Sequence, residues 1–150
     1  MLPSMEPDIR AIADRLAIEQ VLFRYSTAID TKNFALLDDV FVADGIADYA
    51  TAGGIRGTLP EIKEWLANAM SMFTVIQHLV TNLTVEIDGD QATTSCYLFN
   101  PIGYPGAGEK VEMLFCGGIY RDKFVRTPKG WRIRERVLQA LYIDGKLPGE

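Results

Sequence analysis

The sequence has few of the side chains that bind metals or form disulfides, and it has no long apolar run. It contains one histidine, His78, and two cysteines, Cys96 and Cys116, without metal-ligand spacing, so we expect no metal site. Both cysteines lie in apolar runs, which favours buried free thiols. No run reaches the roughly 18 apolar residues of a transmembrane helix, and the opening MLPSMEPDIR lacks the pattern of a signal peptide. We therefore expect a cytoplasmic protein without a membrane segment.

Basic residues are also outnumbered. The 150 residues include 15 Lys and Arg against 20 Asp and Glu, which gives a formal net charge of -5. Nucleic acids and anionic membranes require a basic surface, so we expect neither as a partner. Hydrophobic residues make up 48% of a chain that has the length of one ordinary domain. The composition therefore predicts a single domain, 1–150, with a sizeable core.

The front of the chain is helical in pattern and the back alternates like strands. Apolar residues at three- and four-residue steps predict a first helix from about Pro7 to Ala28, and further helices from Asn33 to Phe41 and from Pro60 to Met70. The segment IADYA predicts a short strand. After Phe73 the period changes to two, in runs rich in β-branched and aromatic residues: 74–87, 91–100, 111–126 and 131–143. Turn signals separate these runs, so the sequence predicts an α+β fold with helices packed on one face of a curved antiparallel sheet.

His78 is the first candidate for chemistry, because imidazole moves protons near neutral pH. Asp30 follows the first predicted helix. Each has a purely structural alternative: His78 as a core histidine with one hydrogen bond, and Asp30 as a turn or capping residue of the second helix. Tyr25 lies on the apolar face of the first helix, where it fits either a core position or a site. Tyr49 lies beside a glycine-rich loop.

Three long segments carry a resemblance to a known family. They are RLAIEQVLFRYSTAIDTKNFALLDDVFVADGIADY, IQHLVTNLTVEIDGDQAT and GGIYRDKFVRTPKGWRIRER. In order and spacing they resemble the SnoaL-like branch of the nuclear transport factor 2-like superfamily, over nearly the whole chain. The resemblance implies a cone-shaped barrel that encloses an apolar pocket. The superfamily contains cyclases, dehydratases, isomerases and binding modules, so the fold alone does not define an activity.

A more specific resemblance is to the dehydratases of the scytalone dehydratase and bile-acid 7α-dehydratase type, which use an Asp-His pair. Asp30 in AIDTKNF and His78 in IQHLV match that pair, and Tyr25 and Tyr49 match two pocket tyrosines. The resemblance thus implies catalytic roles for these four residues and no cofactor. Asn100 stands where the bile-acid enzyme has an aspartate, and a second pocket histidine is missing. We therefore expect a different substrate.

These residues predict a cofactor-independent lyase of the dehydratase type, or an isomerase. His78 would act as base with Asp30 as its partner, and the tyrosines would donate hydrogen bonds. The expected substrate is an apolar polycyclic, aromatic or steroid-like small molecule. A polyketide-cyclase-like enzyme and a binding module without catalysis remain as alternatives. The candidate substrate-binding residues are Asn82, Tyr97, Phe99 and Asn100.

The last predicted strand combines two patterns. Arg132, Arg134 and Arg136 alternate with other residues, which is typical of a strand face exposed to solvent or to a partner. Beyond them both faces are apolar, so we expect one face to pack against another subunit; the residues concerned are Val137, Leu138, Leu141, Tyr142 and Ile143. The family resemblance implies either a homotrimer, as in the dehydratase-like members, or a homodimer, as in the wider superfamily.

Overall fold

The computed structural model describes residues 8–150. Pro7, the predicted start of the first helix, and most of the opening segment judged for a signal peptide lie outside the described residues. Helix α1 (Ile9–Asp30) begins after Asp8, whose side chain accepts hydrogen bonds from two free amides of the first turn. Its end is two residues later than predicted, because the buried Ile29 continues the apolar face. Asp30 is therefore the last residue of the helix.

The other helical segments are short. The second predicted helix is a 3-10 helix, η1 (Phe34–Asp39), and a further 3-10 turn, η2 (Ala50–Ala52), follows the first strand. Helix α2 (Leu59–Ala69) agrees closely with the third prediction. It begins at Thr58, whose amide and hydroxyl both donate to the carboxylate of Glu61 at 2.7 Å. No helix within residues 8–150 is both long and apolar enough to cross a membrane.

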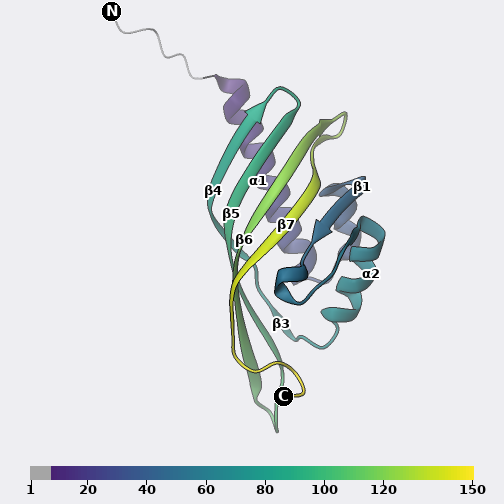
Figure 1. Ribbon diagram of the computed structural model, residues 1–150, viewed down its shortest axis with the longest axis vertical. Helices are drawn as coiled ribbons and strands as arrows, with labels where there is room; N and C mark the ends of the chain where they lie inside the picture. Colours follow the sequence, from purple (N-terminus) through teal and green to yellow (C-terminus); the bar gives the residue numbers. More distant parts are fainter. Residues whose placement is uncertain (1–7) are drawn as a thin grey trace, which may run out of the picture.

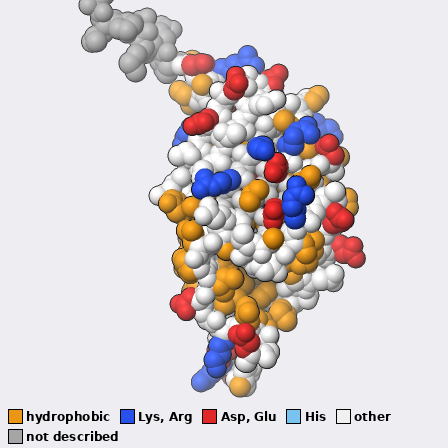
Figure 2. All heavy atoms as spheres, viewed as in Figure 1, with side chains coloured by type: hydrophobic (Ala, Val, Ile, Leu, Met, Phe, Trp, Pro, Cys, Tyr) orange, Lys and Arg blue, Asp and Glu red, His pale blue; other side chains and the backbone are white. Residues whose placement is uncertain are grey.

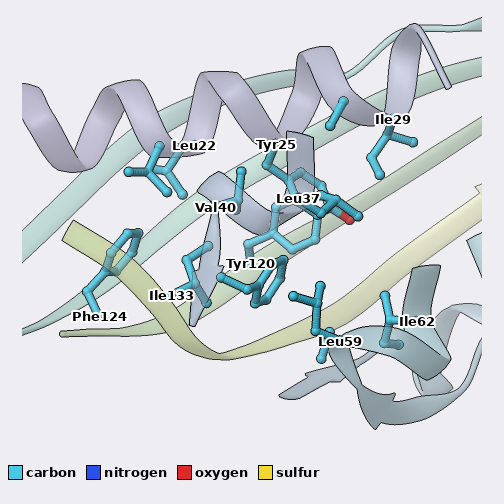
Figure 3. Packing of buried hydrophobic residues seen from close by; sticks show 14 of the residues in the cluster. Leu22, Tyr25, Ile29, Leu37, Val40, Leu59, Ile62, Tyr120, Phe124 and Ile133 are labelled. Carbon is cyan, nitrogen blue, oxygen red and sulfur yellow. The ribbon is translucent and has the colours of Figure 1, made fainter. Parts of the chain in front are cut away.

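The strands form one strongly curled sheet that makes a half-barrel around the helices (Figure 1). Their order is β2-β1-β7-β6-β5-β3, with β4 also paired to β5. The strands are β1 (Phe41–Asp48), β2 (Arg56–Thr58), β3 (Val75–Ile76), β4 (Leu79–Asp88), β5 (Gln91–Pro105), β6 (Val111–Thr127) and β7 (Gly130–Asp144). Helix α1 lies across the inner face, and its residues Leu22, Tyr25 and Ile29 point toward Tyr120 and other buried side chains (Figure 3).

The prediction of a purely antiparallel sheet is wrong at one pair. β1 runs parallel to β7, with Ala47 opposite Arg136. Turn signals predict how neighbouring strands pair, but β1 and β7 come from opposite ends of the chain and no local turn joins them. The strand predicted in IADYA is the end of the longer β1, and Tyr49 follows it.

The exposed arginine face predicted for β7 is also wrong at Arg136, whose side chain is completely buried. The register between β6 and β7 shifts so that Ile133 pairs with Phe124 while Glu135 pairs with Lys123. Arg134 is thus an extra residue in β7. Such a bulge reverses the alternation beyond it, and this turns Arg136 toward the inner face of the sheet.

Candidate active site

An apolar cavity of about 230 Å³ lies between the C-terminal half of α1, helix α2 and the inner face of the sheet. Most of its wall is hydrophobic, with Trp65 from α2 and Leu98 from β5 among the lining residues. Binding pockets commonly combine such a wall with a few polar groups that orient the ligand. The polar side chains that line this cavity are Tyr25, Tyr49, His78, Asn100, Cys116 and Tyr120.

Asp30 and His78, which are 48 residues apart in sequence, meet at this cavity. Oδ1 of Asp30 lies 2.6 Å from Nδ1 of His78, and Oδ2 accepts the backbone N–H of His78 at 3.0 Å. The His78 side chain is only 6% exposed, and that of Asp30 is 25% exposed. One contact holds the ring of His78 and the other holds its backbone, so the orientation of the imidazole is fixed. An ionised Asp30 selects the tautomer with the proton on Nδ1, which leaves Nε2 with a free lone pair.

The backbone around His78 departs from the strand that the sequence predicts. The run 74–87 is divided into β3 and β4, and Gln77 and His78 lie in the break. Asn100 donates from Nδ2 to the carbonyl oxygen of Gln77 at 2.8 Å, which holds this break against β5. The same nitrogen lies 3.4 Å from Nδ1 of His78. Asn100 therefore supports the backbone beside the Asp-His pair, and it also lines the cavity.

Two phenols stand next to the pair. The hydroxyl groups of Tyr25 and Tyr49 are 2.8 Å apart and buried, and the Tyr25 ring meets the His78 ring edge to face at 6.1 Å between centroids. Burial, with a smaller effect of neighbouring phenols, raises the pKa of Tyr49 well above its usual 10. The Tyr49 hydroxyl thus keeps its proton at neutral pH and is available as a hydrogen-bond donor.

Three of the predicted substrate-binding residues lie outside the cavity. Tyr97 and Phe99 are 47% and 41% exposed, because strand alternation turns them away from the face that carries Leu98 and Asn100. Asn82 lies at an irregularity of β4 with a positive φ of 54°, beside a small depression near Glu19. Of the four predicted binding residues, only Asn100 lines the cavity.

The sheet face that carries Tyr97 and Phe99 is rich in exposed apolar groups. Figure 2, which views the sheet from the side opposite α1, shows hydrophobic side chains gathered over the lower half of the molecule. Leu141 and Tyr142 are about half exposed. Packing of this face against another subunit stays a prediction.

Sequence reasoning missed several lining residues, including Tyr120 and Cys116. Tyr120 is inward on β6 by the same period of two that places Leu114 and Phe124, so the alternation contained a signal for it. Burial raises the pKa of the Cys116 thiol, which disfavours the thiolate. Within residues 8–150, no three side chains of the His, Cys, Asp or Glu type converge in a way that could hold a metal ion.

Helices on a strongly curled mixed sheet around an apolar cavity define the cone fold of the nuclear transport factor 2-like superfamily. The family model of the SnoaL-like domain matches residues 10–137, and the chain belongs to this family. A relative with no characterised function, Rv2910c of Mycobacterium tuberculosis, is 46% identical over 129 residues, which cover 86% of each chain.

Solved structures repeat the fold. The Kfla4162 protein of Kribbella flavida is 27% identical, with a TM-score of 0.81 over 89% of this chain and 95% of that one. A type 3 LinA hexachlorocyclohexane dehydrochlorinase of Novosphingobium barchaimii is 18% identical, with a TM-score of 0.78 over 96% and 97% of the two chains. A protein of Novosphingobium aromaticivorans, provisionally named a scytalone dehydratase, is 20% identical, with a TM-score of 0.77 over 91% and 90%. The last two likenesses concern the fold alone.

Proposed function

We propose that this protein is a small-molecule lyase or isomerase that needs no cofactor and uses His78 as general base. The observation that carries the proposal is the 2.6 Å contact between Asp30 Oδ1 and His78 Nδ1 at the wall of an apolar cavity. Asp30 orients the imidazole and stabilises the imidazolium that forms when Nε2 takes a proton. The fold is one that eliminating enzymes such as the LinA dehydrochlorinases also have.

The first chemical step is the removal of a proton from a carbon next to a carbonyl group. Nε2 of His78 takes the proton, and the electron pair moves onto the carbonyl oxygen, which accepts a hydrogen bond from Tyr25 or Tyr49. In an elimination the pair then returns to form a C=C bond, hydroxide leaves the neighbouring carbon, and the imidazolium protonates it to water. In an isomerisation the imidazolium instead returns the proton to a different carbon.

The size of the cavity points to a compact substrate. Pockets for drug-sized ligands have volumes of roughly 300–1,000 Å³, and this cavity has about 230 Å³. One or two rings with a single carbonyl or hydroxyl group suit this volume better than a steroid does. The apolar wall would hold the rings, and the polar groups of Tyr25, Tyr49 and His78 would contact the one oxygen and the acidic C–H.

Carbon–deuterium exchange tests the proposed base before the true substrate is known. The bicyclic ketone 2-tetralone is incubated in D₂O with the protein, and loss of its C–H signals beside the carbonyl is followed by NMR. We expect the parent chain to accelerate exchange above the buffer rate, His78→Ala to remove the acceleration, and Asn82→Ala, outside the cavity, to retain it. Equal exchange by the parent and His78→Ala would contradict the role of His78.

A receptor without catalysis is the competing function. One observation favours it: the backbone N–H of His78 also bonds to Asp30, so the pair joins the end of α1 to the break between β3 and β4. This structural role would account for Asp30 and His78 in a receptor that transfers no proton. Saturable binding of 2-tetralone without faster exchange would support the receptor and reject the base.

A further inference from the structure

A second ion pair lies directly behind the cavity wall. Asp122 on β6 and Arg136 on β7 are opposite each other in register, and both side chains are completely buried. Nε of Arg136 donates to Asp122 Oδ1 at 2.7 Å, and Nη2 donates to Oδ2 at 2.8 Å. Thr94 also donates to Oδ2, at 3.3 Å. The two parallel bonds fix the plane of the guanidinium group.

The guanidinium lies against two of the cavity's phenols, whose rings are inclined at 74° to each other. Its central carbon lies 4.1 Å from the ring centre of Tyr25 and 3.9 Å from that of Tyr120. Both rings line the cavity, and the hydroxyl of Tyr25 lies 2.8 Å from the hydroxyl of Tyr49. A cation over an aromatic face is attracted to the ring, and more so when water is excluded. Arg136 therefore contacts the ring of Tyr25, which carries one of the two paired hydroxyl groups of the proposed site.

Stability alone is a weak reason for this arrangement. Removing both charges from water is costly, and well-packed apolar residues often replace a buried ion pair without loss of stability. Here Nη1 of Arg136 also has no hydrogen-bond partner within residues 8–150, which adds to the cost. The positive charge does have an effect on its neighbours. It lowers the pKa of Tyr49 and Tyr120, against the larger effect of burial, which raises both.

We propose that Arg136, held by Asp122, is a positioning residue that fixes the ring of Tyr25 and polarises the Tyr25–Tyr49 hydroxyl pair, so that the cavity prefers an anionic oxygen. A phenol beside a cation is a better hydrogen-bond donor, because its partial negative charge is stabilised by the nearby positive charge. The oxygen that gains charge when His78 removes a proton is the group that benefits. This inference rests on the proposed function, because it assigns that site its oxyanion support.

The chain contains a matched control at the other end of α1. Arg126 makes two bonds to Asp14, at 2.7 and 2.8 Å, and its guanidinium lies 4.4 Å from the ring of Trp131. Arg126 thus shares with Arg136 a forked bond to an aspartate and a contact with an aromatic ring, although it is 25% exposed and its Nε also donates to Asp90 at 2.8 Å. None of Arg126, Asp14 and Trp131 lines the cavity. Arg126→Lys therefore removes a two-bond contact with an aspartate and a contact with an aromatic ring, and it leaves Tyr25 and Tyr49 unchanged.

The test uses 2-naphthol, whose neutral and ionised forms have different absorption spectra. The ionised fraction of the bound dye, compared with the free dye at the same pH, measures how strongly the cavity prefers an anion. We expect the parent and Arg126→Lys to share this preference and Arg136→Lys to lose about tenfold of it, which corresponds to one pKa unit of the dye. The double change Asp122→Leu with Arg136→Met should lose as much, and it keeps the core folded if Arg136→Lys does not.

A double-mutant cycle shows whether Arg136 acts through Tyr25. In a Tyr25→Phe background, Arg136→Lys should cause little further change in anion preference. An unchanged preference after the Arg136 substitutions, or an equal loss with Arg126→Lys, would overturn the role of Arg136 while leaving the proposed function intact. A parent chain that binds neither form of 2-naphthol would instead count against the cavity as a substrate site, and against this inference with it.

Discussion

Helix α1 carries an aspartate near each end, and the two differ in what their partners can do. Asp14 accepts two hydrogen bonds from Arg126 and one from the indole N–H of Trp131, at 2.7 to 3.0 Å. Asp30 accepts the backbone N–H and the imidazole of His78. Arginine and indole do not release protons in the physiological range, whereas imidazole does. The first carboxylate is thus part of a fixed ion pair, and the second is coupled to a group that changes protonation.

The surroundings of the two carboxylates reinforce this difference. The hydrogen bonds from Arg126 and Trp131 hold the pKa of Asp14 at about 2, below its usual 3.8, so the carboxylate is ionised at neutral pH. Asp30 is the last residue of α1, where the helix dipole disfavours a negative charge. It also adjoins the cavity, which Asp14 does not. A carboxylate that lies at the unfavourable end of a helix dipole and beside a cavity indicates a function more strongly than one that accepts three hydrogen bonds in a fixed ion pair.

Loss of His78 is expected to have the largest effect. Without the imidazole, Asp30 has no base beside it to orient, so His78→Ala should lower enzyme-dependent exchange of 2-tetralone by about 10²- to 10⁴-fold. Added imidazole that enters the cavity should restore part of the rate in proportion to its concentration. Unchanged circular dichroism would show that the fold of His78→Ala is intact. If added imidazole did not raise the exchange rate of this variant, the result would argue against His78 as the base.

The change Asp30→Asn tests the difference between Asp14 and Asp30 directly, because the amide keeps the shape of the Asp30 side chain and removes its charge. The imidazolium then loses its stabilising anion, and an amide nitrogen facing Nδ1 favours the wrong tautomer. We expect exchange to fall by about 10- to 100-fold, with Nε2 becoming the protonated nitrogen in ¹⁵N NMR spectra of the single histidine. An unchanged tautomer together with an unchanged rate would show that the pair is structural.

Much of the fold could be predicted because periodicity is a local signal. The repeat of apolar residues in α1 and the alternation in β5 to β7 appear directly in the sequence. The parallel pairing of β1 with β7 and the bulge at Arg134 could not be predicted, since both depend on contacts between distant segments. That one extra residue reverses the side on which Arg136 lies, and so conceals the buried ion pair from a pattern of period two.

The candidate site could be predicted in part. His78 was a candidate from its chemistry alone, and its pairing with Asp30 and the roles of Tyr25 and Tyr49 came from the resemblance to a family. The structure brings the four residues together. Tyr97 and Phe99 were chosen from the correct strand but on the wrong face, although Asn100 in the cavity implies by alternation that Leu98 faces it too. Side chains from α2, such as Trp65, have no local signal, because only the packing of helix on sheet makes them part of the wall.

At the opposite end of the helix, Asp14→Asn should change stability and leave exchange unaltered. The loss of charged hydrogen bonds to Arg126 and Trp131 is expected to cost about 1–3 kcal/mol at pH 7, measured by urea unfolding. Because the folded pKa of Asp14 is depressed to about 2 from 3.8, its contribution is complete above 3.8 and disappears as the pH falls toward about 2. The difference between parent and variant should therefore narrow in acid. A constant difference, or a slower exchange, would contradict this separation of roles.

The smallest effect is expected for Arg126→Lys, which sharpens the comparison because the ionised partner Asp14 stays in place. A lysine keeps one charged contact but loses the second bond of the fork and the stacking on Trp131 at 4.4 Å. The pair is partly exposed, so we expect only a small loss in the free energy of unfolding, less than that of Asp14→Asn. The same substitution at Arg136 removes a contact with the tyrosines of the cavity. If Arg126→Lys slowed 2-tetralone exchange as much as Arg136→Lys, the two ends of the helix would not be independent, and the cavity would respond to general loosening of the fold rather than to the charge behind its tyrosines.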